Sequence, residues 1–195
     1  MPWEKSFDRT QAVRDAMDVF WRCGYEGTGI NQLVEATGAS RYGLYDEFGD
    51  KRGLFLEALD AYVEDVVRRN LGALENEDAG LADIHGYYQR MLGMGASENN
   101  PLGCLMCMTA MTMDGADEAI AERVAGYIER LRSSFARALV NAKTAGDISP
   151  TADPEALAAF LVGLTQGAAV MDRAGAGGKA IEQQIRTGLT ILDTA

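Results

Sequence analysis

Hydrophobic residues recur along most of the chain at the three- to four-residue spacing of amphipathic helices. Near the N-terminus the spacing runs i, i+3, i+4 and i+7, at Val13, Ala16, Met17 and Phe20. Segments that alternate apolar and polar residues, which are typical of half-buried strands, are scarce. The pattern therefore predicts an all-α fold of about nine helices.

Helix start and stop signals divide the chain into two parts. A short predicted helix begins after Ser40, a favourable N-cap residue, and ends before Gly49, which can adopt a left-handed conformation. Asp50 then begins a longer predicted helix. We therefore expect an N-terminal three-helix domain over residues 1–49 and a helical second domain over residues 50–195.

The same signals place five further helices in the second domain, with a polar loop at 97–101. They are predicted over 80–96, 103–113, a long segment that ends before Gly146, a segment that begins at Pro154, and a last segment after the glycine-rich gap 175–178.

Two short helices joined by a turn at Gly38, with a third helix in front, match the pattern of a helix-turn-helix module. Residues 28–55 also resemble, without gaps, the N-terminal signature of the TetR/AcrR family of bacterial repressors. The matching positions are Thr28, Ile30, Gly38, Ser40, Leu44, Tyr45, Phe48, Lys51, Leu54 and Phe55. The resemblance implies a dimeric repressor, not an enzyme, whose N-terminal domain binds a palindromic double-stranded DNA operator and whose remainder binds a small-molecule inducer.

The resemblance also implies which residues contact DNA. Thr28, Tyr45 and Lys51 would donate hydrogen bonds to phosphates. Arg41 and Tyr42, on the second short helix, would face the bases in the major groove. With the helix-capping serine added, the DNA-binding candidates are Thr28, Ser40, Arg41, Tyr42, Tyr45 and Lys51.

Two of these candidates have an alternative structural role. Ser40 caps its helix whether or not it touches DNA. Tyr45 can instead pack against Phe48 and the long fourth helix.

Acidic residues interrupt the predicted DNA-facing helix. Asp46 and Glu47 follow Leu44-Tyr45, where many relatives carry aromatic, histidine or basic residues. Carboxylates repel phosphates, although one could accept from a cytosine amino group or pair with a nearby cation. We expect these residues to make DNA binding weaker and more sensitive to salt.

A Cys-x-x-Cys stands at the start of the predicted helix 103–113. The segment that begins Gly103-Cys104-Leu105 resembles a helix start found in a subset of TetR/AcrR relatives, and its second thiol is Cys107. Thiols three residues apart share a helix face, which suits a dithiol switch or, with the nearby methionines, a soft metal. Both cysteines can equally be apolar core or pocket-lining residues.

The inducer pocket is expected between the fourth, fifth, sixth and seventh predicted helices. Apolar walls with a few polar groups suit a drug-sized ligand of apolar or aromatic character. The candidate ligand-binding residues are Tyr62, His85, Tyr88, Met91, Met94, Cys104, Cys107, Met108, Met111 and Tyr127.

Small residues in the next-to-last helix permit close packing between helices. They are Gly163, Gly167 and Ala168, on or near the same face as Leu164. By resemblance, the last two helices would form the interface of a homodimer, which a two-fold operator requires.

Composition and charge set the remaining expectations. The net charge of −11 disfavours indiscriminate binding to nucleic acid or anionic membranes, but it allows a local DNA site. The N-terminus lacks a signal-peptide pattern and three cysteines do not form a disulfide framework, so we expect a cytoplasmic protein without membrane attachment. No catalytic constellation, cofactor motif or zinc-like ligand cluster stands out, which leaves a dithiol oxidoreductase using Cys104 and Cys107 as the alternative function.

Overall fold

The computed structural model describes residues 7–95, 103–113 and 117–194, and within these ranges the chain is all-α, as predicted. The N-terminal helices are α1 (Arg9–Gly27), α2 (Ile30–Thr37), α3 (Arg41–Phe48) and α4 (Lys51–Tyr62). The later helices are α5 (Arg68–Leu71), α6 (Leu81–Gly95), α7 (Leu105–Thr112), α8 (Glu118–Ala145), α9 (Pro154–Arg173) and α10 (Gly178–Thr194). The loop predicted at 97–101 lies outside the described residues.

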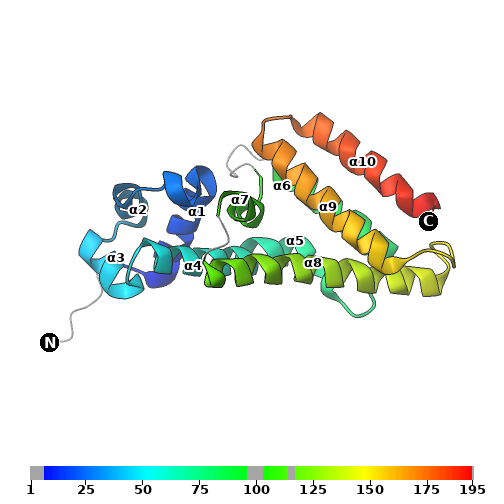
Figure 1. Cartoon of the computed structure of the whole chain (residues 1–195), viewed down its shortest axis with the longest axis horizontal. Coiled ribbons are helices and arrows are strands. Elements are labelled where there is room, and N and C mark those ends of the chain that lie inside the picture. Colours follow the sequence, from blue (N-terminus) through cyan, green and yellow to red (C-terminus); the bar gives the residue numbers. More distant parts are fainter. Residues whose placement is uncertain (1–6, 96–102, 114–116, 195) are drawn as a thin grey trace.

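The fourth predicted helix is one continuous rod that changes its winding. A π-helical turn, Val63–Val67, joins α4 to α5, and a 3₁₀ turn, Gly72–Glu75, ends the rod. If residues 51–75 count as one helix, the described part of the chain has nine helices, in agreement with the sequence pattern. The rod leaves the N-terminal module and extends into the second half of the molecule (Figure 1).

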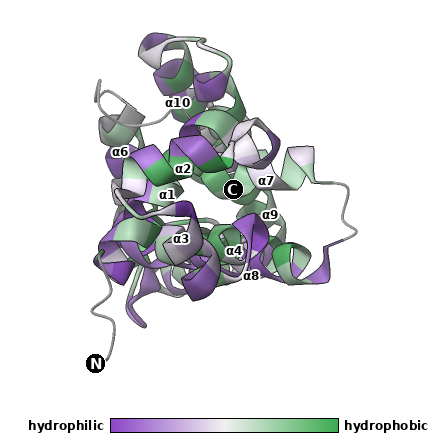
Figure 2. Cartoon of the chain, turned by 90° about the vertical axis from the view of Figure 1, so that its left-hand side faces the viewer, coloured by the Kyte–Doolittle hydropathy of each residue, from purple (hydrophilic) through white to green (hydrophobic). Residues whose placement is uncertain are grey.

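Helix caps fix the N-terminal module. The Ser40 side chain accepts from the backbone N–H of Gly43 at 3.0 Å, and the Asp50 side chain accepts from that of Gly53 at 2.7 Å. Gly38, in the turn between α2 and α3, has φ +66°, a conformation that favours glycine. Phe20, Leu33 and Leu44 of the module are buried, and Figure 2 shows both hydrophobic and hydrophilic residues along its helices.

The second half is built on α8, the longest described helix, which runs along one edge of the molecule; α9 packs on α8, and α10 packs on α9 (Figure 1). The Arg123 guanidinium binds both carboxylate oxygens of Asp60 on α4, at 2.7 and 2.8 Å. Arg52, at the start of α4, likewise binds Asp117, the N-cap residue of α8. These paired contacts set the position of the rod on α8.

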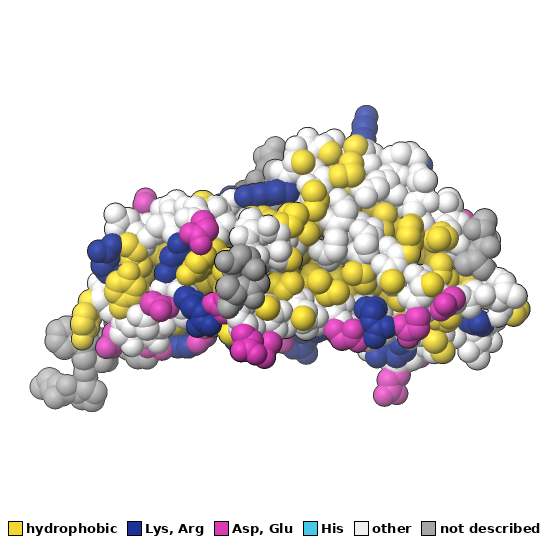
Figure 3. Space-filling model, viewed as in Figure 1, with side chains coloured by type: hydrophobic (Ala, Val, Ile, Leu, Met, Phe, Trp, Pro, Cys, Tyr) yellow, Lys and Arg dark blue, Asp and Glu magenta, His cyan; other side chains and the backbone are white. Residues whose placement is uncertain are grey.

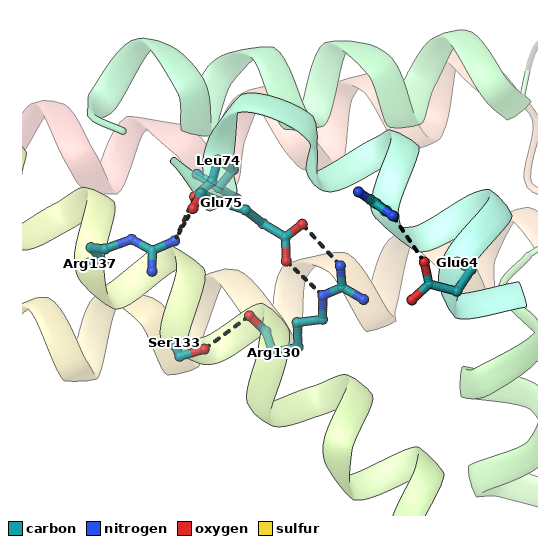
Figure 4. Close-up of polar contacts among 7 residues, drawn as sticks. Glu64, Leu74, Glu75, Arg130, Ser133 and Arg137 are labelled. Atoms are coloured by element: carbon teal, nitrogen blue, oxygen red, sulfur yellow. Dashed lines mark hydrogen bonds and ion pairs between the residues drawn. The ribbon is translucent and has the colours of Figure 1, made fainter. Parts of the chain in front are cut away.

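The far end of the rod is also attached to α8 (Figure 4). Arg130 donates to both carboxylate oxygens of Glu75, at 2.6 and 3.0 Å, and Arg137 donates to the Glu75 main-chain oxygen at 2.8 Å. The Asn141 amide donates to the main-chain oxygens of Glu77 and Ala79, both at 2.8 Å. Three α8 side chains thus hold the turn that leads from the rod to α6.

Helix α9 is the one described helix that is long and apolar enough to cross a bilayer. It packs between α8 and α10, and its residues Ala158 and Leu161 are fully buried (Figure 1). The Thr165 hydroxyl donates to the main-chain oxygen of Leu161 at 3.0 Å. Helices of other kinds meet the same criteria of length and hydropathy, so one such helix does not by itself indicate a membrane span.

Gly53 is predicted to be required for the junction between α3 and α4. A Cβ atom there would lie 2.0 Å from the main-chain oxygen of Phe48. We expect Gly53→Ala to lower the free energy of unfolding by about 1–3 kcal/mol or more, because backbone must shift to admit the methyl group. Urea unfolding followed by circular dichroism measures the change.

Gly126 provides the matched control. It lies inside α8, and a Cβ atom there would meet nothing within 4 Å. Gly126→Ala should raise the free energy of unfolding by about 0.5–1 kcal/mol, because alanine loses less backbone entropy in a helix. Equal effects of the two substitutions would contradict the tight junction at Gly53.

Candidate DNA-binding surface and ligand cavity

Helix α3 presents an open face with long polar side chains. Arg41 is exposed, 79% of Tyr42 is exposed, and 41% of Tyr45 is exposed. The opposite face is anchored by Leu44 and Phe48, which are buried. The Ser40 side chain is used in the helix cap, so the exposed face carries three of the six DNA-binding candidates.

The other two candidates lie at the edges of this face. Thr28 is buried, and its hydroxyl donates to the main-chain oxygen of Gly24 at 2.6 Å. The Lys51 ammonium group lies 4.3 Å from the centre of the Tyr25 ring, in a cation–π contact. The structure therefore places Thr28 beneath the surface and leaves Lys51 partly exposed at the start of α4.

The two acidic residues of α3 differ in their surroundings. Asp46 is exposed. Glu47 accepts from Arg9 at 2.6 Å, and the same guanidinium binds Glu57 at 2.6 Å and lies over the Phe48 ring. Glu47 therefore serves an ion-pair network that joins α1, α3 and α4, and its charge is balanced within the module.

A cavity of about 540 Å³ lies in the second half of the molecule, bordered by the rod and by helices α1, α6, α8, α9 and α10. Its volume is within the range of sites that bind drug-sized ligands. Five predicted ligand-binding residues line it together: Tyr62, Met91, Met94, Cys104 and Tyr127.

The structure places the other five predicted residues away from the cavity wall. His85, on α6, and the exposed Met111, on α7, do not line it. Tyr88 is buried behind the wall, where its hydroxyl donates to the Leu161 main-chain oxygen at 2.8 Å. Cys107 and Met108 are buried on other faces of α7.

Several lining residues were missed by the pattern along the chain. They include Trp21, Val67, Asn70, Tyr87, Thr165 and Asp172. Trp21 comes from α1, far from the other lining residues in sequence, and Val67 and Asn70 follow the π-helical turn, which shifts the face of the rod. One of these residues could have been found from the sequence. Tyr87 and Tyr88 are adjacent on α6 and face different directions, so only one of them can line the cavity, and it is Tyr87 and not the predicted Tyr88.

Hydroxyl and thiol groups meet at one end of the cavity. The Cys104 thiol lies 3.6 Å from the Tyr127 hydroxyl, which also accepts from Gln166 at 3.4 Å. Burial raises the pKa of Tyr62 and of Tyr127 well above the usual phenol value. Both phenols therefore stay neutral at physiological pH and can donate hydrogen bonds to a ligand.

The two cysteines of the Cys-x-x-Cys have different surroundings. The Cys107 thiol faces the Gln166 main-chain oxygen at 4.0 Å, and burial together with the nearby Cys104 raises its pKa to about 11. A buried thiol with a high pKa is a poor nucleophile at neutral pH. The geometry does not support the dithiol alternative, and the described residues contain no group of three or more His, Cys, Asp or Glu that could hold a metal ion.

A small cluster of contacts joins the DNA-binding module to the cavity. The Trp21 indole N–H donates to the Gly103 main-chain oxygen at 3.1 Å, and the Gly103 N–H donates to Asp172 at 2.7 Å. Arg173 donates to the main-chain oxygens of Trp21 and Arg22, at 3.4 and 2.8 Å, near the end of the regular part of α1. We call these five residues the interdomain latch.

Gly103 is the residue that the latch requires most strictly. Its φ is +77°, and a Cβ atom there would lie 2.9 Å from the Ala169 main-chain oxygen. The Gly-Cys start of α7 is thereby explained by a close approach to α9.

Comparison with known proteins matches both halves of the chain. The family described as "Bacterial regulatory proteins, tetR family" matches residues 13–58, and "Tetracyclin repressor-like, C-terminal domain" matches residues 80–187. The chain is 32% identical over 191 residues to the HTH-type transcriptional repressor ComR of Escherichia coli (strain K12), covering 96% of this chain and 90% of ComR. It is 28% identical over 158 residues to the HTH-type transcriptional regulator YezE of Bacillus subtilis (strain 168), covering 80% of this chain and 81% of YezE.

A solved structure shows the same arrangement of helices. A cysteine mutant of the TetR family transcriptional regulator CifR, complexed with 26-bp double-strand operator DNA, superposes with a TM-score of 0.83. Its sequence identity is 26%, and the match covers 95% of this chain and 96% of the CifR chain. The agreement in sequence extends over nearly the whole chain and the fold agrees with it, so this protein belongs to the TetR family of bacterial transcriptional regulators.

Proposed function

We propose that this protein is a cytoplasmic repressor that binds a palindromic operator as a homodimer and releases it when a small molecule of largely apolar or aromatic character fills the cavity. One arrangement carries this function: the capped, exposed face of α3 is linked by a single helical rod to a cavity of about 540 Å³. The repressor role of ComR and the operator complex of CifR support the assignment. The boundary between the two domains falls at the start of the rod.

The DNA-binding candidates divide into base-reading and phosphate-contacting groups. Arg41 and the highly exposed Tyr42 read bases, because both project from the first turn of α3 without a competing structural role. Tyr45 and Lys51 contact phosphates from the rim of the module. Thr28 contributes to DNA binding indirectly. Its hydroxyl already donates to the Gly24 main-chain oxygen, and this bond holds the start of α2 in place.

The homodimer forms through an apolar stripe on α9. The stripe consists of exposed residues at helical spacing, namely Ala156, Ala159, Phe160, Gly163 and Val170. Figure 3 shows apolar side chains gathered over this half of the molecule. Of the small residues noted in the sequence, Gly163 is open to a partner, whereas Ala168 is buried within the chain.

Ligand binding reaches α3 by two connections. Helix α4 begins beside α3, where Gly53 approaches Phe48, and ends at Tyr62 in the cavity wall. The interdomain latch adds a second route, because Trp21 lines the cavity from α1 and stacks edge-on against Tyr62 with ring centres 4.9 Å apart. The module can take two orientations relative to the cavity, and only one of them fits the operator. A ligand that binds one orientation more tightly than the other changes the free energy of operator binding by the difference between its two binding free energies.

The base-reading role of Arg41 is tested on an operator selected from genomic fragments by the reduced, purified protein. Arg41→Ala should weaken operator binding by about 10- to 150-fold, the loss of one bidentate base contact, and should relax the preference at one base position. Fluorescence anisotropy at fixed salt measures the affinities. Arg132→Ala, on α8, is the control and should bind as the unchanged protein does; the same result for Arg41→Ala would contradict its role.

Asp46 is predicted to weaken DNA binding through its charge. Asp46→Asn should raise operator affinity by about two- to ten-fold at low salt and by less at high salt, because it removes one exposed negative charge near the phosphates. Glu47→Gln should not share this gain, since Glu47 is already paired with Arg9. A salt series of affinities for both variants, with Glu77→Gln as a distant control, separates the two effects; equal gains from both α3 variants would reject the distinction.

The dimer interface is tested by charge insertion. Phe160→Arg, in the middle of the α9 stripe, should produce a monomer at about 10 µM protein and lower the operator affinity, because one subunit then binds one half-site. Light scattering after size exclusion gives the mass. Val140→Arg is the matched control, since Val140 is similarly exposed but lies on α8; a dimeric Phe160→Arg variant would exclude this face.

A further inference from the structure

The cavity carries a carboxylate without a cationic partner. Asp172 lines the cavity and accepts one hydrogen bond, from the Gly103 N–H at 2.7 Å. It forms no ion pair with any Lys, Arg or His in the described ranges. Asp172 also lies in the last turn of α9, where the helix dipole adds negative potential.

The two nearby arginines bind main-chain oxygens. The Arg173 guanidinium binds the main-chain oxygens of Trp21 and Arg22, and Arg90 binds those of Asn70 and Leu71. Neither arginine lines the cavity. Two exposed residues of α10, Lys179 and Glu182, stand at the cavity rim with opposite charges, and Glu182 is paired with Arg186.

A second acceptor in the cavity wall has no donor. The Asn70 side-chain oxygen is buried and makes no hydrogen bond. A buried carbonyl oxygen without a donor destabilises the fold, and a ligand that donates a hydrogen bond to it removes that penalty. The cavity therefore offers two acceptors, Asn70 and Asp172, to a bound molecule.

Aromatic rings form much of the remaining wall. Trp21, Tyr62, Tyr87 and Tyr127 all line the cavity. Burial raises the pKa of the three tyrosines, so their rings remain neutral phenols whose faces attract cations. Apolar surface, ring faces and an unpaired carboxylate are the features that recognise a hydrophobic cation.

We propose that the inducer is a hydrophobic amine whose protonated nitrogen pairs with Asp172 and whose further polar group donates a hydrogen bond to Asn70. This inference rests on the proposed function and names the chemical class of its ligand. Because Asp172 also accepts from the Gly103 N–H of the interdomain latch, an ammonium group at Asp172 shares its carboxylate with a contact that positions Trp21. The Asp172 carboxylate then both recognises the charge of the inducer and takes part in the contacts that hold the DNA-binding module.

The test uses three probes of matched shape and different charge: phenylhexylamine, phenylhexanol and phenylhexanoate. Calorimetry gives their affinities, and Trp21 fluorescence in a Trp3→Phe background, which leaves one tryptophan, locates binding at the cavity. We expect the amine to bind at least about 10-fold more tightly than the alcohol, and the carboxylate most weakly. An amine that binds no better than the alcohol or the carboxylate, or none below about 1 mM, overturns the inference.

Asp172→Asn separates charge from structure. The asparagine oxygen can still accept from the Gly103 N–H, so the fold should be retained. The preference for the amine over the alcohol should fall to within about two-fold, a loss of about 1 kcal/mol or more of discrimination. Glu182→Gln, at the rim, should keep the full preference; an unchanged preference in Asp172→Asn rejects Asp172 as the recognition site.

Operator binding without probe is measured separately. A protein that binds the amine but selects no DNA contradicts the proposed function and leaves the ligand class standing. A protein that binds its operator and prefers phenylhexanoate keeps the proposed function and overturns the ligand class.

Discussion

The main chain of Gly103 connects the parts of this molecule that must act together. Its oxygen accepts from the Trp21 indole on the DNA-binding module, and its N–H donates to Asp172 at the end of α9. Only a residue without a side chain fits between these partners, since any Cβ atom would meet the Ala169 main-chain oxygen. The cavity wall, the start of α7 and the position of α1 all depend on the close approach of Gly103 to Ala169.

Electrostatic contacts in this protein orient helices more than they stabilise the fold. Paired arginines and carboxylates fix α4 on α8 and the end of the rod on the same helix. Each pair is partly exposed, so solvent screens it and it adds little to the stability of the fold. Their value lies in geometry, because the angle between the rod and α8 determines where α3 stands. Arg9 likewise balances the charge of Glu47 on the exposed helix α3 of a strongly acidic chain.

The sequence predicted the helices well because caps and apolar spacing are local signals. Ser40 and Asp50 cap their helices as expected, and the exposed Arg41 and Tyr42 lie on the predicted face. The cavity was predicted only in part, since its wall depends on packing between distant segments. Trp21 reaches the cavity from α1. The turn at 63–67 is π-helical, and the spacing of apolar residues does not predict this.

Trp21 has a consequence for the modularity of such regulators. Its ring belongs to the helix-turn-helix module by sequence and to the ligand cavity by position. Grafting the first fifty or so residues of another regulator onto the second half of this chain would therefore alter the wall of the cavity as well as the helix-turn-helix module. A functional chimera would have to exchange Trp21, Gly103 and Arg173 together. The boundary for such engineering is therefore set by the contacts of the interdomain latch and not by a single position in the sequence.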